Sequence, residues 1–311
     1  MIWLRKWRVL VTDAKDEVAL DVSDLHITFE ARYARETESF ATVRIYNLNR
    51  ETETRIISEG DRVIVEAGYQ SEGDSKAGQY GVIFDGQVIY PSRSKDSNTD
   101  YVLTLLCVDG SNKLNKNFIS MACMRGQNQR QLLQAACANA RVPIPVDYIS
   151  QGLSPQKLPR GKVFFGVAKD MIDNIARGNA ATYYMASGVL NVTKTTDPVE
   201  GEGIVVTPET GLIGTPTQTQ YGADFKLLLN PAVKLGMLIQ LKNSEINERQ
   251  AKPGEAQTPL DPDRIYQAIE VTFVGDTRGN DWYTNVTGIS RDGKGALAAI
   301  LSNASQNANG V

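Results

Sequence analysis

The sequence predicts a mainly β protein in which two antiparallel β units flank a middle region of mixed helices and strands. Three observations predict this fold class. Apolar and polar residues alternate with a period of two in several segments before residue 110 and again from residue 224, which is the pattern of half-buried strands. Two segments between them carry apolar residues at helical spacing. The two β regions also repeat the same order of parts.

Five or six strands are expected before residue 110. Their apolar positions are Leu25, Ile27 and Phe29; Ala41, Val43 and Ile45; Val63, Val65 and Ala67; and Val82, Phe84 and Val88. Residues 101–108 carry apolar side chains on both faces of the strand that they are expected to form. The connections contain the turn residues Gly73, Gly78, Pro91 and Asn98. An antiparallel sheet curled toward a barrel or sandwich is the expected result.

The two β regions share a sequence of parts: a strand, a Leu-Asn pair, a short turn or helix, a glycine and a new strand. The matching positions are Leu48, Asn49 and Gly60 in the first copy and Leu229, Asn230 and Gly236 in the second. Residues 50–59 are expected to form a short helix. Asn49 and Asn230 are favourable N-caps, and each glycine suits the left-handed conformation at a helix C-terminus. The pattern therefore predicts a duplicated β unit.

The middle region is expected to contain two amphipathic helices and a hairpin. The helices are predicted for residues 127–140 and 167–177, where Leu133, Ala136, Cys137 and Ala140, then Ala168, Met171, Ile172, Ile175 and Ala176, recur at helical spacing. Prolines interrupt residues 141–162. Residues 182–185 and 189–193 form the expected hairpin, with Ser187 and Gly188 in its turn.

Four domains follow from this pass along the chain. We expect a first β-barrel at 1–115, a mixed helical and β middle domain at 116–210, a second β-barrel at 211–292, and a C-terminal helix with a polar tail at 293–311. The length of 311 residues agrees with about two large domains and their insert.

The composition excludes several classes of protein. With 33 basic and 36 acidic residues, the net charge of −3 gives no bulk electrostatic case for binding duplex nucleic acid. No apolar run reaches the roughly 18 residues that a membrane helix needs, so no membrane insertion is expected. The cations among residues 1–8 interrupt the apolar core that a signal peptide would have. We therefore expect synthesis and retention in the cytosol.

No motif indicates a catalytic residue, a metal site or a cofactor. The three cysteines show no CxxC spacing and are expected to be small buried hydrophobes. The single histidine, His26, is expected to be exposed on its strand. No nucleotide-binding glycine motif is present. These features favour a protein that is not an enzyme.

Two other functions remain open at this point. A cell-wall hydrolase of glycosidase type would use paired carboxylates such as Asp13 and Asp24, although an acidic strand edge that resists edge pairing explains them as well. A carbohydrate-binding module would expose several aromatics on one face, whereas Trp3, Trp7 and Trp282 are scattered in the sequence.

Both β units resemble those of hub proteins from phage tail baseplates. In the second unit the resemblance rests on residues 265–271 (IYQAIEV), 275–282 (GDTRGNDW) and 283–288 (YTNVTG), preceded by Leu229-Asn230-Pro231 and Gly236. In the first it rests on residues 41–48 (ATVRIYNL), 63–68 (VIVEAG) and 84–88 (FDGQV). Each motif is a turn or strand, and their order over most of the chain carries the resemblance.

The resemblance implies a mainly β fold with two tail-tube-like barrels flanking a mixed α/β domain. It implies a homotrimer whose six similar units adapt a threefold central spike to the sixfold tail tube, around a channel for the tape-measure protein and DNA. The implied partners are the tail spike, the tail tube protein, other baseplate proteins and the tape-measure protein, with DNA only in transit. The implied location is the virion baseplate, with host cytoplasm during assembly.

Two polar loops are the expected interaction sites. They span residues 70–79 and 243–263, lie between strands at corresponding places of the two units, and have little apolar surface with which to order themselves. The residues predicted to contact partners are Gln70, Glu72, Asp74 and Lys76 in the first loop and Glu245, Glu248, Arg249, Lys252 and Glu255 in the second.

Overall fold

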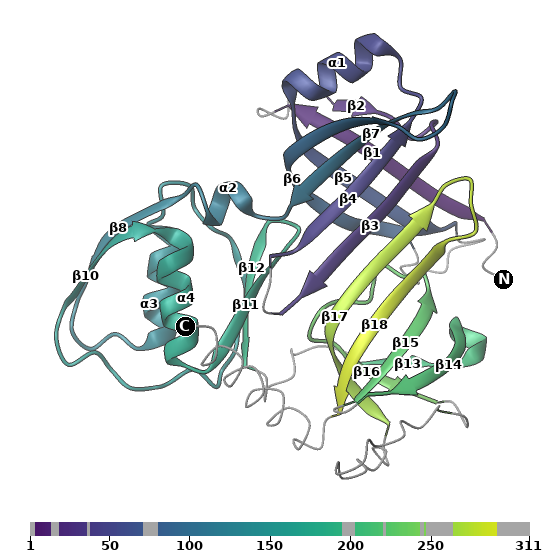
Figure 1. Ribbon diagram of the computed structural model, residues 1–311. Helices are drawn as coiled ribbons and strands as arrows, with labels where there is room; N and C mark the ends of the chain where they lie inside the picture. The colour runs from purple at the N-terminus through teal and green to yellow at the C-terminus, as the bar shows by residue number, and fades with distance from the viewer. Residues whose placement is uncertain are drawn as a thin grey trace, which may run out of the picture.

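The computed structural model describes residues 4–13, 19–35, 38–70, 80–194, 203–219, 222–242, 246 and 264–290 (Figure 1). No helix in these ranges is long and apolar enough to cross a membrane. The first β unit contains β1 (Arg5–Asp13), β2 (Ala19–Asp21), β3 (Ile27–Ala34), β4 (Phe40–Tyr46), α1 (Arg50–Glu59), β5 (Gly60–Tyr69), β6 (Tyr80–Lys95) and β7 (Tyr101–Val108).

The middle region contains α2 (Ser111–Leu114), β8 (Phe118–Cys123), α3 (Gln129–Ala138), β9 (Val146–Ile149), β10 (Lys162–Val167), α4 (Ala168–Gly178), β11 (Ala181–Ala186) and β12 (Val189–Lys194). The second β unit contains β13 (Ile204–Val206), a 3₁₀ turn at Pro208–Thr210, β14 (Leu212–Gln218), β15 (Gly222–Leu228), β16 (Leu238–Leu241), β17 (Ile265–Asp276) and β18 (Trp282–Ser290). The predicted C-terminal helix at 293–311 lies outside the described residues.

Most of the predicted strands of the first unit are confirmed. The expected strand at residues 101–108 has the bounds of β7, and the apolar positions of β3, β4 and β5 are buried. Pro91 was expected in a connection but lies inside β6, which continues past a bulge between Val88 and Tyr90. The strand β1 is not among the predicted strands, although Trp7, Val9 and Val11 recur there at a spacing of two residues.

The helix expected at residues 50–59 is confirmed as α1. The Asn49 side chain accepts a hydrogen bond from the N–H of Thr52, which caps the helix as predicted. The left-handed conformation expected of Gly60 is wrong, because its φ is −70°. A glycine is required there by close packing instead, since a Cβ atom would lie 2.6 Å from the carbonyl oxygen of Ile56.

The corresponding turn of the second unit is shorter. Residues 231–237 form turns rather than a helix, so Asn230 does not cap a helix. Its side chain accepts the N–H of Ala232 instead, two residues later in the chain. Gly236 has a φ of +85°, which confirms the predicted left-handed conformation at this glycine.

The predicted repeat is confirmed by the strand order. In the first unit the order is β3-β4-β7-β6-β5, and in the second it is β14-β15-β18-β17-β16. All of these pairings are antiparallel. The fourth strand of each unit also has a bulge against the third, at Val88/Tyr90 in β6 and at Ala268/Glu270 in β17. Each unit is therefore built on the same five-stranded plan.

The expectation of two separate barrels is wrong. The described strands of both units join in one 13-stranded sheet, which forms no closed barrel and whose main path ends at β14 and β2. The units merge because β17 extends beyond its short partner β16, and its free edge then pairs with β3 (Figure 1). One hydrophobic core runs through both units, from Val9 and Ile27 to Tyr266 and Val286.

The middle region has its own hydrophobic core, as a mixed α/β insert predicts. The two expected helices are confirmed as α3 and α4, and their predicted apolar residues lie in this second core. The predicted hairpin is confirmed as β11 and β12, with positive φ at Ser187 and Gly188. Figure 1 shows the region beside the large sheet, with β11 and β12 nearest to it.

Candidate assembly interface

The seam between the two β units lies where β17 pairs with β3. Seven antiparallel residue pairs form it, from Glu270 opposite Ala34 to Asp276 opposite Thr28. Arg32 of β3 donates two hydrogen bonds to the carboxylate of Glu270, at 2.7 and 2.9 Å. Such a bidentate pair fixes the relative position of two strands as well as their charges. The seam therefore has a definite register.

His26 and Asp276 form a second polar contact at the end of this seam. Their side chains lie 2.8 Å apart, and the imidazole stacks on the ring of Tyr46 at 4.3 Å. The exposed position predicted for His26 is wrong, because the side chain is about 29% exposed and is held between the two units. Partial burial raises the pKa of Asp276, but hydrogen bonds, chiefly from the N–H groups of Arg278 and Gly279, bring it below the usual value.

Trp282 is the main apolar anchor of the seam. It belongs to β18 of the second unit, is 3% exposed, and donates from Nε1 to the carbonyl oxygen of Gly68 in the first unit at 3.2 Å. Its ring meets those of Trp7 and Phe29 edge to face, at 6.0 and 5.5 Å. Trp7 and Trp282 thus pack against each other in the shared core. A carbohydrate-binding module would instead need such rings exposed on its surface.

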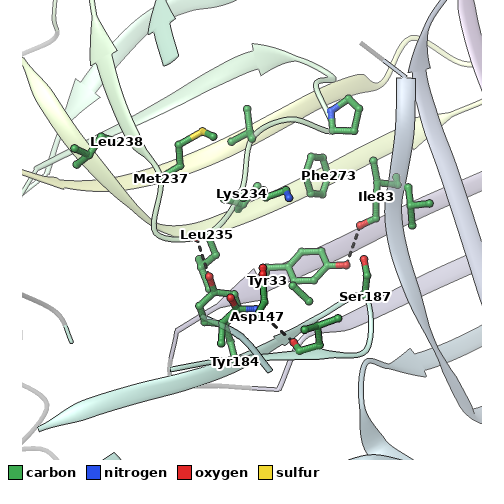
Figure 2. A pocket seen from close by; sticks show the side chains of 17 residues that line it. Tyr33, Ile83, Asp147, Tyr184, Ser187, Lys234, Leu235, Met237, Leu238 and Phe273 are labelled. Carbon is green, nitrogen blue, oxygen red and sulfur yellow. Dashed lines mark hydrogen bonds between the residues drawn. The ribbon is translucent and has the colours of Figure 1, made fainter. Parts of the chain in front are cut away.

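A pocket of about 500 Å³ lies where the two β units and the hairpin β11–β12 meet (Figure 2). Tyr33 donates its hydroxyl to the carbonyl oxygen of Ile83 at 2.9 Å, and Tyr184 donates to that of Leu235 at 3.0 Å. Burial raises the pKa of Tyr184 to about 12. These tyrosines link β3 to β6 and the hairpin to the second unit, so they position the three parts.

The lining of this pocket does not supply paired catalytic groups. Its charged residues are Asp147 and Lys234, and most of the remaining lining is apolar. Asp13, one of the two carboxylates considered for a hydrolase, borders a much smaller pocket of about 10 Å³, and Asp24 is not part of that lining. The described cavities therefore do not bring Asp13 and Asp24 together in one site.

The middle region is tied to the sheet through the buried carboxylate of Asp109. This residue follows β7, is 2% exposed, and accepts the N–H of Gly188 in the β11–β12 turn at 2.9 Å. Lys113 donates to the carbonyl oxygen of the same glycine at 2.7 Å. Burial raises the pKa of Asp109 to about 7, and the nearby carboxylate of Asp85 also raises it.

Two of the strand edges that are open among the described residues lie in different β units. The first belongs to β6 beyond its bulge, where Tyr90 is 63% exposed and residues 90–95 pair only with β7. The N–H of Asp96 donates to Asp100 across the β6–β7 turn. Successive N–H groups of an antiparallel strand point alternately toward its partner and away from it. Because the N–H of Asp96 points toward β7, those of Lys95 and Arg93 point to the open edge. Pro91, which has no N–H, lies at the next position whose backbone nitrogen faces this open edge.

The second open edge belongs to β14. This strand ends the main path of the sheet and pairs only with β15. Its ladder is irregular between Ile213 and Thr217, and it contains Pro216. Proline and irregular pairing are typical of edge strands that must not pair indiscriminately. One of these two open edges thus lies in each unit.

The predicted interaction residues lie mostly outside the described part of the chain. Gln70 alone is described: it is exposed, and its N–H donates to the carbonyl oxygen of Leu4 at 2.8 Å. The other eight fall in residues 71–79, 243–245 and 247–263, which are not described. The described strands show that the two loops connect equivalent pairs, β5 to β6 and β16 to β17. No sequence signal pointed to the open edges, because exposure of an edge depends on strand order.

Comparisons with known proteins point to phage tails. A family model described as baseplate hub gp41 matches residues 8–252. No curated protein sequence matches the chain. The 43 kDa tail protein of prophage MuSo2 from Shewanella oneidensis has a similar structure, with a TM-score of 0.57, 8% identity, and coverage of 92% of this chain and 98% of that one.

Two further solved structures have similar folds. The tail protein from Neisseria meningitidis MC58 gives a TM-score of 0.55 at 8% identity, covering 94% of this chain and 98% of that one. The E. coli c3393 protein, a type VI secretion component described as similar to T4 tail proteins gp27 and gp5, gives 0.52 at 11% identity, covering 85% and 73%. At these identities the likeness shows the fold.

Proposed function

The chain belongs to the baseplate hub gp41 family, a family of structural proteins of the phage tail, and from this we propose that it is a homotrimeric symmetry adaptor. In this proposal three chains present six similar β units, which join a threefold tail spike to the sixfold tail tube. The observation that carries the proposal is the shared strand order of the two units in one chain. Closed cyclic symmetry is the general expectation for homo-oligomers.

The seam within the chain supports a specific way to close the trimer. Within one chain, the fourth strand of the second unit, β17, pairs beyond its bulge with β3, the first strand of the first unit. The equivalent strands are β6 and β14, and these carry the two open edges. Pairing β6 of one protomer with β14 of the next repeats the same seam, so each of the six units is joined to its neighbours alike.

The register of this second seam follows from residue rows that cross each unit. Two equivalent rows start at the residue after each bulge: Tyr90, Leu106, Thr42 and Glu30 in the first unit, and Glu270, Thr287, Asp224 and Thr217 in the second. Thr217 is therefore the equivalent of Glu30. Ser94 lies four residues beyond Tyr90, as Val274 lies four beyond Glu270. Because Val274 opposes Glu30 within the chain, Ser94 should oppose Thr217 of the neighbouring protomer.

The remaining partners follow from the same proposal. The ring surrounds a channel for the tape-measure protein and for DNA in transit. The spike, the tail tube protein and other baseplate proteins contact the trimer, in part through the loops at 70–79 and 243–263. The chain is assembled in the host cytoplasm and ends in the virion baseplate. We retain the domain division at 115, 210 and 292 as part of this proposal, although β13, before residue 210, pairs with β16 of the second unit.

The oligomeric state of the purified protein tests the proposal. The chain has a mass of 34.1 kDa, so light scattering coupled to size exclusion should give about 102 kDa at micromolar concentration. A Lys95→Pro variant removes an outward N–H from the open edge of β6 and should shift the mass toward 34 kDa. Lys226→Pro, inside β15, is a comparison variant in which the proline lies away from the open edge of β6. A monomer at all concentrations, with or without co-expressed tail proteins, would argue against the trimer.

A further inference from the structure

The middle region has a positive charge that the chain average conceals. Residues 111–178 contain ten lysines and arginines against three aspartates, a net charge of +7, whereas the whole chain carries −3. The remaining residues therefore carry −10. Two of the ten cations are paired, Lys169 with Glu38 and Arg177 with Asp173. Most of the others are exposed.

The same region presents an apolar face to solvent. The two-stranded ribbon of β8 and β10 covers the middle core with one face, which carries Ile119 and Phe164. Its other face carries Phe118, Val163 and Phe165, of which Val163 is 76% and Phe165 is 79% exposed. The rings of Phe118 and Phe165 meet edge to face at 4.6 Å, so they form one patch.

Positive charges stand at both ends of this ribbon. At the Cys123 end, Arg125 follows β8, Arg160 precedes β10, and Lys162 is the first residue of β10, which pairs with β8. At the Phe118 end, Lys116 precedes β8, and the N–H of Arg141 bonds to the carbonyl oxygen of Phe118. None of these five cations forms an ion pair with a described residue. The three aspartates of the region lie on β9 and α4.

The outer edge of β10 is also open. Among the described strands, β10 pairs only with β8, and the opposite edge of β8 is bridged at Ile119 to Ala140. Two-stranded ribbons are marginally stable in isolation, and a third strand stabilises them. An extended peptide can add to such an edge through its backbone while its alternate side chains cover the adjoining face.

We propose that β10 is the docking edge for an extended acidic segment of another tail protein. The segment adds as a third strand, its apolar side chains cover Val163 and Phe165, and its carboxylates face the cations at the two ends of the ribbon. The net charge of +7 and the unpaired cations select an acidic partner. Val163, the aliphatic residue in the patch, and the open backbone edge of β10 favour a protein segment over nucleic acid as the partner. This proposal rests on membership of the hub family and stands independently of the trimer.

Photochemical crosslinking in assembled tails tests the proposal. The photoreactive residue p-benzoylphenylalanine would replace Phe165 in one chain and Val163 in a second, with exposed Asn174 on α4 as the matched control position. Tails purified from phage-producing cells would be irradiated, and the crosslinked peptide sequenced by mass spectrometry. We expect both ribbon positions to link to one peptide of another tail protein, with a net negative charge, and the control position not to link to it.

The charge requirement has its own test. Arg125→Glu combined with Arg160→Glu should reduce the crosslink yield at residue 165 at least severalfold. The single reversal Lys157→Glu, next to Leu158, which bonds to Gly126 and Gln127 beyond the same end of the ribbon, should reduce it less. Crosslinks to a second copy of this chain, to DNA, or to a neutral or basic peptide would overturn the proposal, as would the absence of any crosslink at both ribbon positions. These outcomes leave the oligomeric mass unaffected, so the two proposals fail separately.

Discussion

Trp282 of the second β unit donates its indole N–H to the carbonyl oxygen of Gly68 in the first, at 3.2 Å. The side chain is nearly fully buried and touches Trp7 and Phe29, both from the first unit. The two units of one chain are therefore held by a shared core as well as by the β17–β3 ladder. A unit released from its neighbour would expose this tryptophan to water.

Replacing this anchor should destabilise the whole sheet. Trp282→Ala removes a large buried ring and should lower the free energy of unfolding by about 3–5 kcal/mol. Trp282→Phe keeps part of the ring and loses the hydrogen bond, so the loss should be smaller, with about 1–3 kcal/mol from the carbonyl left unpaired. Urea unfolding followed by circular dichroism measures both. An alanine variant as stable as the parent would show that the seam does not depend on Trp282.

A glycine in the second unit permits close backbone packing. A Cβ atom on Gly222 would lie 1.9 Å from the carbonyl oxygen of Gly288, so Gly222→Ala should cost about 3 kcal/mol of unfolding free energy. At Gly166 nothing lies within 4 Å of the added atom, and Gly166→Ala should change stability by less than about 0.5 kcal/mol. Equal melting temperatures for the two variants would contradict this account of β15 and β18.

Stability should depend on pH through Asp109. Its pKa is about 7 in the folded protein, raised from 3.8 chiefly by burial. Between these values the folded state holds a proton that the unfolded state has lost, so stability should fall as pH rises from about 4 to about 7 and then level off. The upper bound on this loss is about 4 kcal/mol.

Asp109→Asn provides the control for this pH effect. The amide oxygen can still accept the N–H of Gly188, but the group no longer titrates. The variant should therefore be less sensitive to pH than the parent between pH 4 and 7 when both are unfolded in urea across that range. Parallel curves for the two proteins would mean that Asp109 does not contribute to the pH dependence.

The loop at 243–263 should matter for assembly rather than for folding. Deleting residues 245–259 removes all five predicted contact residues of this loop and no described strand. The purified chain should keep its circular dichroism spectrum and melting temperature, while its incorporation into tails should fall. A serine–glycine replacement of the same length separates chain length from sequence. Normal tail assembly with the deletion would make the loop a dispensable insertion.

Local sequence signals predicted the elements well, and the contacts between distant elements poorly. The helix α1 and the strand β7 were predicted with their observed bounds, because a capping asparagine and an apolar run act within a few residues. The repeated strand order was predicted from the Leu-Asn and glycine positions. The β17–β3 seam was not, because it joins residues more than 230 positions apart and depends on β17 being longer than β16.

The candidate interfaces were largely invisible to the sequence for a related reason. An open edge such as that of β6 is defined by what does not pair with it, which only the assembled sheet reveals. The charge of residues 111–178 was hidden because a chain average of −3 combines a basic region with an acidic remainder. The loops at 70–79 and 243–263 were found because polar composition is a local property, and their role in binding stays a prediction.

The most direct test of the proposed ring is a disulfide across the predicted seam between protomers. Ser94→Cys and Thr217→Cys would be combined in one chain, since both positions are exposed and the three native cysteines are buried. The single variants serve as controls. After mild oxidation, a non-reducing denaturing gel should show a covalent trimer of about 102 kDa for the double variant and only single chains for the controls. A double variant that stays at 34 kDa, although the protein is folded and its new thiols are accessible, would contradict the proposed pairing of β6 with β14.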